Sequence, residues 1–234
     1  MADSVRGAII AAGDGSRLRA DGYRVPKPLV EVAGLPLIGT VLRNFTTTGI
    51  TAITIILNEQ ERECVEWVRT RFPALELDFI VKTTGSSLES FREVTGRGPA
   101  GPMLVSTVDA WCAAEDFARF AAAAAGRPDD ATVLAVTPFV SDEKPLWVTL
   151  GAGGRVEALG KADSGLVTAG VYRVSDRARR LSPARELGRL REYLGWLHES
   201  GEPLYGEIIE TVVDVDRALD VASAEALARG ARRA

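Results

Sequence analysis

The feature that most constrains this chain is an apolar run near its N-terminus that ends in a glycine-rich turn. Residues 9–12 lead into Gly13-Asp14-Gly15-Ser16-Arg17. A short intervening stretch separates this loop from Pro26-Lys27-Pro28. Glycines let backbone N–H groups approach an anion closely, because no Cβ stands in the way. Arg17 offers a planar fork of donors for phosphate oxygens, and Lys27 is a compact charge between two rigid neighbours. The pattern therefore predicts a buried strand that feeds a phosphate-binding loop.

The spacing of this loop excludes the two best-known phosphate-binding motifs. A Walker loop needs G-x-x-x-x-G-K-[ST], which Gly13 and Gly15 do not provide, and a dinucleotide fingerprint needs a third glycine where Leu18 stands. On these residues alone, the alternative is a plain turn at a strand end with scattered surface charge.

Two segments together resemble the N-terminal signature of the nucleoside-triphosphate transferases, which include sugar-1-phosphate nucleotidyltransferases and cytidylyltransferases for choline phosphate and inositol phosphate. A-A-G-x-G-x-R stands at residues 11–17, and P-K-P-L-V-x-V-x-G-x-P-L-I stands at 26–38. The resemblance implies an NTP and a phosphorylated acceptor as substrates, pyrophosphate as product and Mg²⁺ as cofactor. It assigns catalysis to Arg17 and Lys27. It assigns nucleotide binding to Ala11, Ala12, Gly13, Gly15 and Ser16.

Composition narrows the class of protein. Among 234 residues, 46% are hydrophobic and 26% are charged, as in soluble globular proteins, and no apolar run approaches the ~18–20 residues that span a bilayer. The net charge of −4 argues against nucleic acid or an anionic membrane as a partner. Cys64 and Cys112 match no zinc spacing and argue against a disulfide framework, so we expect a reducing cytoplasm.

Strand and helix signals alternate through the first 137 residues. Strands are predicted at 7–12, 52–57, 77–81, 103–106 and 132–137, and helices at 37–48, 60–71, 87–94 and 113–125. This alternation predicts an α/β Rossmann-like three-layer sandwich with a mainly parallel mixed sheet. The resemblance agrees, since it implies the GT-A-like fold of nucleotide-diphospho-sugar transferases.

The pattern changes after about residue 138. Short strands joined by glycine-rich turns at 146–150, 156–159 and 169–174 predict a small antiparallel extension that holds the second substrate. A helix at 185–198, an extended segment at 208–220 and a last helix at 223–229, capped by Ser223, complete the chain. We expect one nucleotidyltransferase domain over 1–234, with a nucleotide-binding half at 1–137 and an acceptor-binding half at 138–220.

Asp109 is the first candidate metal ligand. It follows the strand at 103–106, and α/β sheets bind ligands just past the carboxyl ends of their strands. The alternative is an N-cap for the next helix. The family usually places Gly-Asp here, and that Asp ligates Mg²⁺. This chain has Val108 in place of the glycine, which we expect to narrow the space for the nucleotide.

Mg²⁺ needs a second acid. The resemblance of residues 218–227 to D-[IV]-x-[ST]-P-E-D-L assigns it to Asp220, although Ala224 stands where the family has proline. Asp214 and Asp216 compete, because residues two apart on a strand share one face. They also permit an alternative function, a D-x-D glycosyltransferase with a nucleotide-sugar donor. Solvated carboxylates at a strand edge are the structural alternative for both.

Two further segments complete the resemblance. Lys161 and Gly170, the latter in Ala169-Gly170-Val171-Tyr172, are assigned to the acceptor site. Gly85, Ser86 and Ser87 are assigned to the nucleoside. An exposed lysine and a plain helix N-cap are the alternatives at these places. The departures at Val108 and Ala224 also leave open a non-catalytic module that binds a nucleotide or a sugar phosphate.

Overall fold

The computed structural model describes residues 5–140, 145–160 and 165–231. Seven strands form the main sheet in the order β12-β8-β11-β6-β1-β4-β5. Their bounds are β1 Arg6–Ala11, β4 Ala52–Leu57, β5 Glu76–Val81, β6 Met103–Thr107, β8 Thr132–Thr137, β11 Val167–Val174 and β12 Leu204–Ile208. Only β11 runs antiparallel to its neighbours in this sheet, so the predicted mainly parallel sheet is confirmed.

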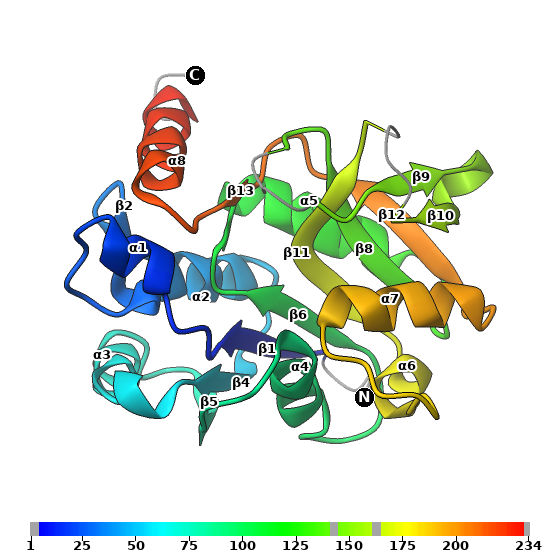
Figure 1. Ribbon diagram of the computed structural model, residues 1–234, viewed down its shortest axis with the longest axis horizontal. Coiled ribbons are helices and arrows are strands. Elements are labelled where there is room, and N and C mark those ends of the chain that lie inside the picture. The colour runs from blue at the N-terminus through cyan, green and yellow to red at the C-terminus, as the bar shows by residue number, and fades with distance from the viewer. Residues whose placement is uncertain (1–4, 141–144, 161–164, 232–234) are drawn as a thin grey trace.

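Helices cover both faces of the sheet, and Figure 1 shows α4 and α7 in front of it with α2 and α5 behind. The helices behind are α2 Leu37–Thr47 and α5 Ala114–Ala125, and α3 Glu63–Arg71 and α8 Ala218–Ala231 add buried residues to the same core. The front core takes residues from α4 Ser87–Thr95, α6 Asp176–Arg180 and α7 Leu190–Glu199. In the part of the chain that the structure describes, no helix is both long and apolar enough to cross a membrane.

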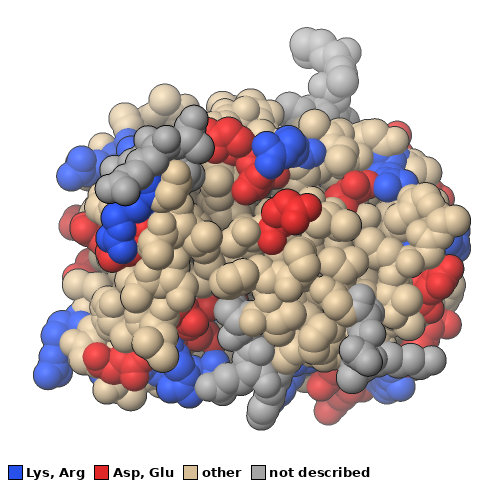
Figure 2. Space-filling model, turned by 90° about the horizontal axis from the view of Figure 1, so that it is seen from above, with Lys and Arg blue, Asp and Glu red and all other residues tan. Residues whose placement is uncertain are grey.

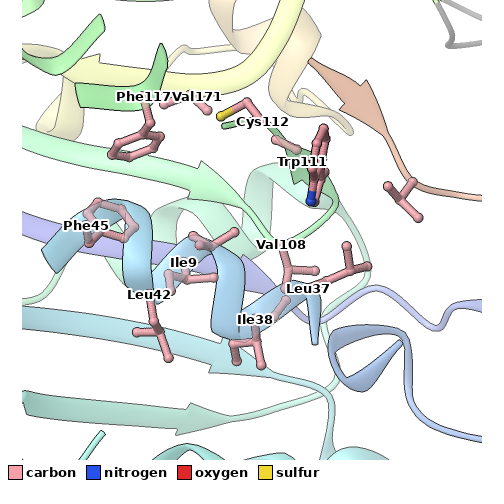
Figure 3. Close-up of a cluster of buried hydrophobic side chains, with 14 of the residues drawn as sticks. Ile9, Leu37, Ile38, Leu42, Phe45, Val108, Trp111, Cys112, Phe117 and Val171 are labelled. Carbon is pink, nitrogen blue, oxygen red and sulfur yellow. The ribbon is translucent and has the colours of Figure 1, made fainter. Parts of the chain in front are cut away.

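The core behind the sheet fixes the segment that follows the first loop. Figure 3 shows Leu37, Ile38, Leu42 and Phe45 of α2 facing the sheet beside Ile9. The Phe45 ring meets Phe117 of α5 edge to face, with centroids 5.3 Å apart. Because α2 is held in this way, the loop that leads from β1 into it is held at both ends.

Three small antiparallel pairs complete the fold. They are β2 Glu31–Val32 with β3 Leu35–Pro36, β9 Val148–Leu150 with β10 Val156–Leu159, and β7 Ala110–Trp111 with β13 Val213–Asp214. The β9–β10 pair confirms the predicted antiparallel extension. The β7–β13 pair matters most for function, because it places Asp214 opposite Ala110, the residue after Asp109.

One strand assigned to the extension lies elsewhere. The segment 169–174 belongs to β11, which pairs with β6 and β8 near the middle of the main sheet. Its glycine-rich surroundings resemble a hairpin locally, whereas the pairing that places it involves strands far away in the sequence. The two predicted halves of the chain therefore share one sheet.

The C-terminal predictions also need correction. β12 was not predicted, and α8 begins at Ala218, so the predicted extended segment ends earlier than residue 220. Ser223 is not a cap, because it lies inside α8 and its hydroxyl donates to the Leu219 carbonyl. The predicted helix at 185–198 begins only at Leu190. Short helices were missed as well, namely α1 Ser16–Ala20, α6 Asp176–Arg180 and the 3₁₀ helices η1 Lys27–Leu29 and η3 Ala152–Gly154.

Candidate functional site

The candidate site lies at the carboxyl ends of β1 and β6, which are neighbours in the main sheet. β1 and β6 are parallel neighbours, and the Val108 N–H donates to the Ile10 carbonyl, so the turn that carries Asp109 lies beside the loop after β1. The β7–β13 pair brings the C-terminal segment to the same place. Loops from three distant parts of the sequence therefore meet at the carboxyl edge of the sheet, where α/β proteins bind ligands.

Lys27 lies at the centre of this meeting point. Its side chain is 8% exposed, and its Nζ donates to Asp109 Oδ2 at 2.6 Å and also to Asp216 Oδ1. Burial alone would lower the pKa of Lys27, but the charges and hydrogen bonds of Asp109 and Asp216 outweigh it and raise this pKa above its ordinary value. The ammonium group therefore stays charged at neutral pH.

Arg17 belongs to the same network. Its Nη1 donates to Asp216 Oδ2 at 2.6 Å, and its side chain is 46% exposed. Asp216 thus accepts from both cations that the resemblance assigns to catalysis. The structure therefore brings Arg17 and Lys27 together, with Arg17 on the open side and Lys27 beneath it.

Gly15 allows the loop to close over Lys27. Its backbone has φ +61°, and a Cβ added there would lie 2.9 Å from the Cβ of Lys27. Any larger residue would combine backbone strain with a clash. This explains in physical terms why a glycine stands at this point of the signature.

The carboxylates of the site form one group. Asp109, Asp214 and Asp216 each offer an oxygen atom, and these three atoms lie within 4.8 Å of one another. Burial would raise the pKa of Asp109, but Lys27 and a hydrogen bond from Thr107 hold it below its ordinary value. Ionised carboxylate oxygens at this separation fit Mg²⁺, which prefers hard oxygen ligands and keeps some of its waters.

Asp220 is not a member of this group. Its carboxylate accepts hydrogen bonds from the backbone N–H groups of Asp216 at 3.0 Å and Arg217 at 2.7 Å, at the start of α8. Ala224 lies inside that helix, where a proline would break it. Asp214 and Asp216 lie before the helix and belong to the carboxylate group, so the geometry favours them over Asp220 as partners of Asp109.

Several predicted nucleotide-binding residues have side chains in the core. Ala11 and Ala12 are buried on opposite faces of the sheet, so only their backbones can face a ligand. Val108 is also buried, and Figure 3 shows it beside Leu37 and Ile38. The expected narrowing of the nucleotide site by Val108 was wrong, because its side chain packs into the core.

The segment 85–87 forms the start of α4. Ser86 Oγ accepts from the Glu89 N–H at 3.1 Å, and the Gly85 N–H donates to Glu89 Oε2 at 2.7 Å. This is the helix N-cap that the sequence left as an alternative. Ser87 Oγ accepts from the Leu190 N–H of α7 at 3.1 Å and lines a neighbouring cavity.

A cavity of about 210 Å³ opens beside the carboxylates. Asp109, Asp214 and Gly170 line it, together with Arg191 from the first turn of α7. Gly170 has φ +72°, and a Cβ there would lie 2.6 Å from Thr107 Oγ1, so only glycine lets β11 pass this close to the end of β6. Lys161, the other predicted acceptor residue, lies outside the described residues.

Asn58 is a site residue that sequence reasoning missed. Its Nδ2 donates to the Ala12 carbonyl at 3.3 Å, and its Oδ1 accepts from the Gln60 N–H at 3.1 Å and from Thr83 Oγ1 at 3.2 Å. It therefore ties together the loops after β1, β4 and β5. The available signal was an asparagine directly after a buried strand, where such side chains bind backbone groups.

Glu61 is a second missed residue. It is buried, and among the described residues its Oε2 has no hydrogen-bond partner. Burial raises the pKa of Glu61 to about 7, although the nearby charges of Arg19 and Lys27 act to lower it. A carboxyl group that titrates near neutrality therefore lies within electrostatic reach of the signature loop.

Charge on the wider surface is mixed. Figure 2 shows acidic and basic side chains interspersed over the face that it draws, with neither sign gathered into one large patch there. The charges that matter for the site are thus the local ones around Lys27.

Comparisons with known proteins point to one family and one fold. The sequence profile of the MobA-like NTP transferase domain matches residues 7–194. A 2-aminoethylphosphonate cytidylyltransferase from Lancefieldella rimae is 30% identical over 102 residues, which are 42% of this chain and 41% of that protein. A CMP-5'-(3-aminopropyl)phosphonate synthase from Streptomyces rubellomurinus is 28% identical over 90 residues, which are 38% of this chain and 14% of that protein. The chain thus spans less than half the length of each of these relatives.

Solved structures share the fold. The inositol-1-phosphate CTP transferase from T. maritima has a TM-score of 0.79 at 18% identity, with 95% of each chain covered. HddC from Yersinia pseudotuberculosis, complexed with GMP-PN, has a TM-score of 0.74 at 18% identity, with 96% of this chain and 99% of that chain covered. Likeness at this identity shows the fold alone, and it confirms the predicted Rossmann-like nucleotidyltransferase fold.

Replacing Glu61 by glutamine should raise the melting temperature at about pH 8 and change it less at about pH 5. The pKa of Glu61 is about 7 in the folded protein, whereas the ordinary value of 4.5 serves as the reference for the unfolded chain. The folded state therefore holds the proton more tightly, and stability falls as the pH rises through this window. Because glutamine cannot ionise, the stability of the variant does not fall for this reason as the pH rises.

Melting curves followed by circular dichroism at both pH values test this prediction for Glu61. The matched control is Glu59→Gln, the same change at an exposed position, which should show no pH-dependent gain. A gain of equal size at both pH values would contradict the ionisation of Glu61.

Proposed function

The chain belongs to the MobA-like NTP transferase domain family, and on this premise we propose that it is a Mg²⁺-dependent nucleotidyltransferase. It moves a nucleoside monophosphate from an NTP to an acceptor that carries a phosphate or phosphonate group, and it releases pyrophosphate. The observation that carries this proposal is the ammonium of Lys27 between Asp109 and Asp216, with Arg17 on the same carboxylate. CTP is the proposed nucleotide, because both relatives are named for CMP or cytidylyl products.

The reaction needs positioning and charge neutralisation more than covalent help. An oxygen of the acceptor's phosphorus group attacks the α-phosphorus of the NTP in line. The bond from the α-phosphorus to the bridging oxygen breaks, and its electron pair leaves with pyrophosphate. Lys27 neutralises the charge on the α-phosphoryl oxygens, while Arg17 and the backbone of residues 13–16 bind the β- and γ-phosphates.

The carboxylate group is proposed to hold the metal ion. Asp109 and Asp216 supply ligands, with Asp214 within reach, in place of the Asp109–Asp220 pair that the sequence favoured. When bound, Mg²⁺ supplies positive charge to the phosphate oxygens. Lys27 keeps the carboxylates close together despite their like charges, because its ammonium group lies between two of them.

The remaining assignments follow the same geometry. The cavity beside Asp109 is proposed to bind the acceptor, with Gly170 in its wall and Lys161 as a predicted further contact. Gly85, Ser86 and the backbone of Ala12 remain proposed for the nucleoside. We place the protein in the cytoplasm, since Cys64 and Cys112 are free thiols.

Pyrophosphate release with Mg²⁺ tests the proposal directly. We expect release with CTP that depends on one phosphorylated or phosphonylated acceptor, and less release with ATP, GTP, UTP or dTTP. A D-x-D glycosyltransferase would instead produce a nucleoside diphosphate from a nucleotide-sugar. Nucleotide binding without turnover for any pair of substrates would favour a non-catalytic binding module.

The variant Lys27→Met should reduce kcat by ~10²–10³, because one preorganised charge at the reacting phosphate is removed while the stem of the side chain is kept. The measurement is pyrophosphate release at saturating substrates, with folding checked by circular dichroism. Arg43→Met removes a cation from an exposed position on α2 and should leave kcat unchanged. Full turnover in Lys27→Met would refute the role of this residue.

Two asparagine variants distinguish the candidate metal ligands. Asp216→Asn should raise the Mg²⁺ concentration for half-maximal rate by about 10-fold or more, since Mg²⁺ prefers charged oxygen ligands. Asp220→Asn should lower the melting temperature, because it weakens two hydrogen bonds at the start of α8, and leave the Mg²⁺ titration unchanged. The reverse result would restore Asp220 as the ligand.

A further inference from the structure

We infer that the acceptor cavity selects a small zwitterion, with a phosphorus oxyanion and an ammonium group on a short apolar body, and that Asp214 binds the ammonium group. This inference rests on the proposed function and names the chemical class of its acceptor. Asp214 would thus decide which acceptor is used, whereas Lys27 and Asp216 act on the phosphates.

The hydroxyl groups that line the cavity already have partners within the protein. The pairs are Ser87 with the Leu190 N–H, Thr137 with the Glu210 carbonyl, Thr107 with Asp109, and Thr168 with Tyr172. A hexose phosphate would bring several hydroxyl groups that compete with these internal partners, and each one that is buried without a hydrogen bond costs free energy. The described wall therefore favours an acceptor with few hydroxyl groups.

The rest of the wall is mainly apolar and the space is limited. Ala110, Leu146, Val167, Leu194 and Val212 line the cavity. Its volume of about 210 Å³ lies below the ~300–1,000 Å³ that is typical of pockets for drug-sized ligands. A short alkyl chain fills such a space and gains from burial of its apolar surface.

Charges of both signs reach into this cavity. Asp214 and Arg191 both line it, and both act on the same buried group. Burial is the main cause that raises the pKa of Tyr172, Asp109 and Asp214 raise it further, and Arg191 lowers it. A wall that carries charges of both signs suits an acceptor with one charge of each sign better than a neutral sugar.

The two neighbouring carboxylates of the C-terminal segment have different surroundings. Asp216 accepts hydrogen bonds from Lys27 and Arg17 and does not line the cavity. Asp214 lines the cavity from β13, and its oxygen lies within 4.8 Å of those of Asp109 and Asp216. An ammonium group on Asp214 would therefore hold the acceptor with its phosphorus group next to the reacting centre.

A comparison of two acceptors of nearly equal shape tests the inference. 2-Aminoethylphosphonate and propylphosphonate differ by an ammonium group in place of a methyl group, and glucose 1-phosphate represents a polyhydroxylated acceptor. With CTP and Mg²⁺, kcat/KM of the wild type should be ~10–10² higher for 2-aminoethylphosphonate than for propylphosphonate, which is the range expected for a charged hydrogen bond. Glucose 1-phosphate should be the poorer substrate.

Matched variants locate the preference. Asp214→Asn should reduce the ratio of the two kcat/KM values towards 1, because the opposite charge is lost. Asp216→Asn should lower both values and keep their ratio. Asp130→Asn, the same change at an exposed turn before β8, should alter neither.

Three results would overturn the inference. The first is equal use of the two phosphonates by the wild type, and the second is a preference for glucose 1-phosphate. The third is an Asp214→Asn variant that loses rate with both phosphonates but keeps the wild-type ratio of their kcat/KM values. The first two leave the proposed nucleotidyltransferase function intact, since pyrophosphate is still released. Absence of release with every acceptor would instead overturn the proposed function, and the inference with it.

Discussion

The site depends on one buried ammonium group between two carboxylates. Three carboxylates whose oxygens lie within 4.8 Å repel one another, and burial makes this repulsion stronger. Lys27 offsets it, and the partners that it joins are 82 and 189 residues away in the sequence. The same ion pairs that lie at the proposed phosphate site therefore also tie the C-terminal segment to the end of β1. Arg17 extends the network to the open surface, where a triphosphate would arrive.

The parts of the site that the sequence predicted are the local ones. Arg17, Lys27 and Gly15 lie within one signature over residues 11–38, and backbone freedom, rigid prolines and charge single them out. The central strands were found for the same reason, since a buried parallel strand is a continuous apolar run. Asp109 could be placed because the end of a parallel strand is a defined position in the sheet.

The parts that the sequence did not place depend on pairing between distant segments. β11 was assigned to the extension because its glycines resemble hairpin turns, whereas its place between β6 and β8 follows from hydrogen bonds to strands far away. Asp216 was ranked below Asp220 because residues 218–227 resemble the family motif D-[IV]-x-[ST]-P-E-D-L, which is a local match. Because α8 begins at Ala218, Asp220 lies in its first turn, and its carboxylate accepts hydrogen bonds from backbone N–H groups there.

The spacing of Asp214 and Asp216 then has a mechanistic consequence. Asp216 is bound by both cations of the phosphate loop, while Asp214 faces the acceptor cavity. Because Asp214 lies in β13 and Asp216 follows it closely, the short pairing of β13 with β7 places both carboxylates relative to Asp109. Correct orientation is the main contribution that a protein can make to the proposed in-line transfer. A cationic acceptor held by Asp214 would be oriented by the same strand that leads into the proposed metal ligand Asp216, so acceptor recognition and catalysis would share one structural element.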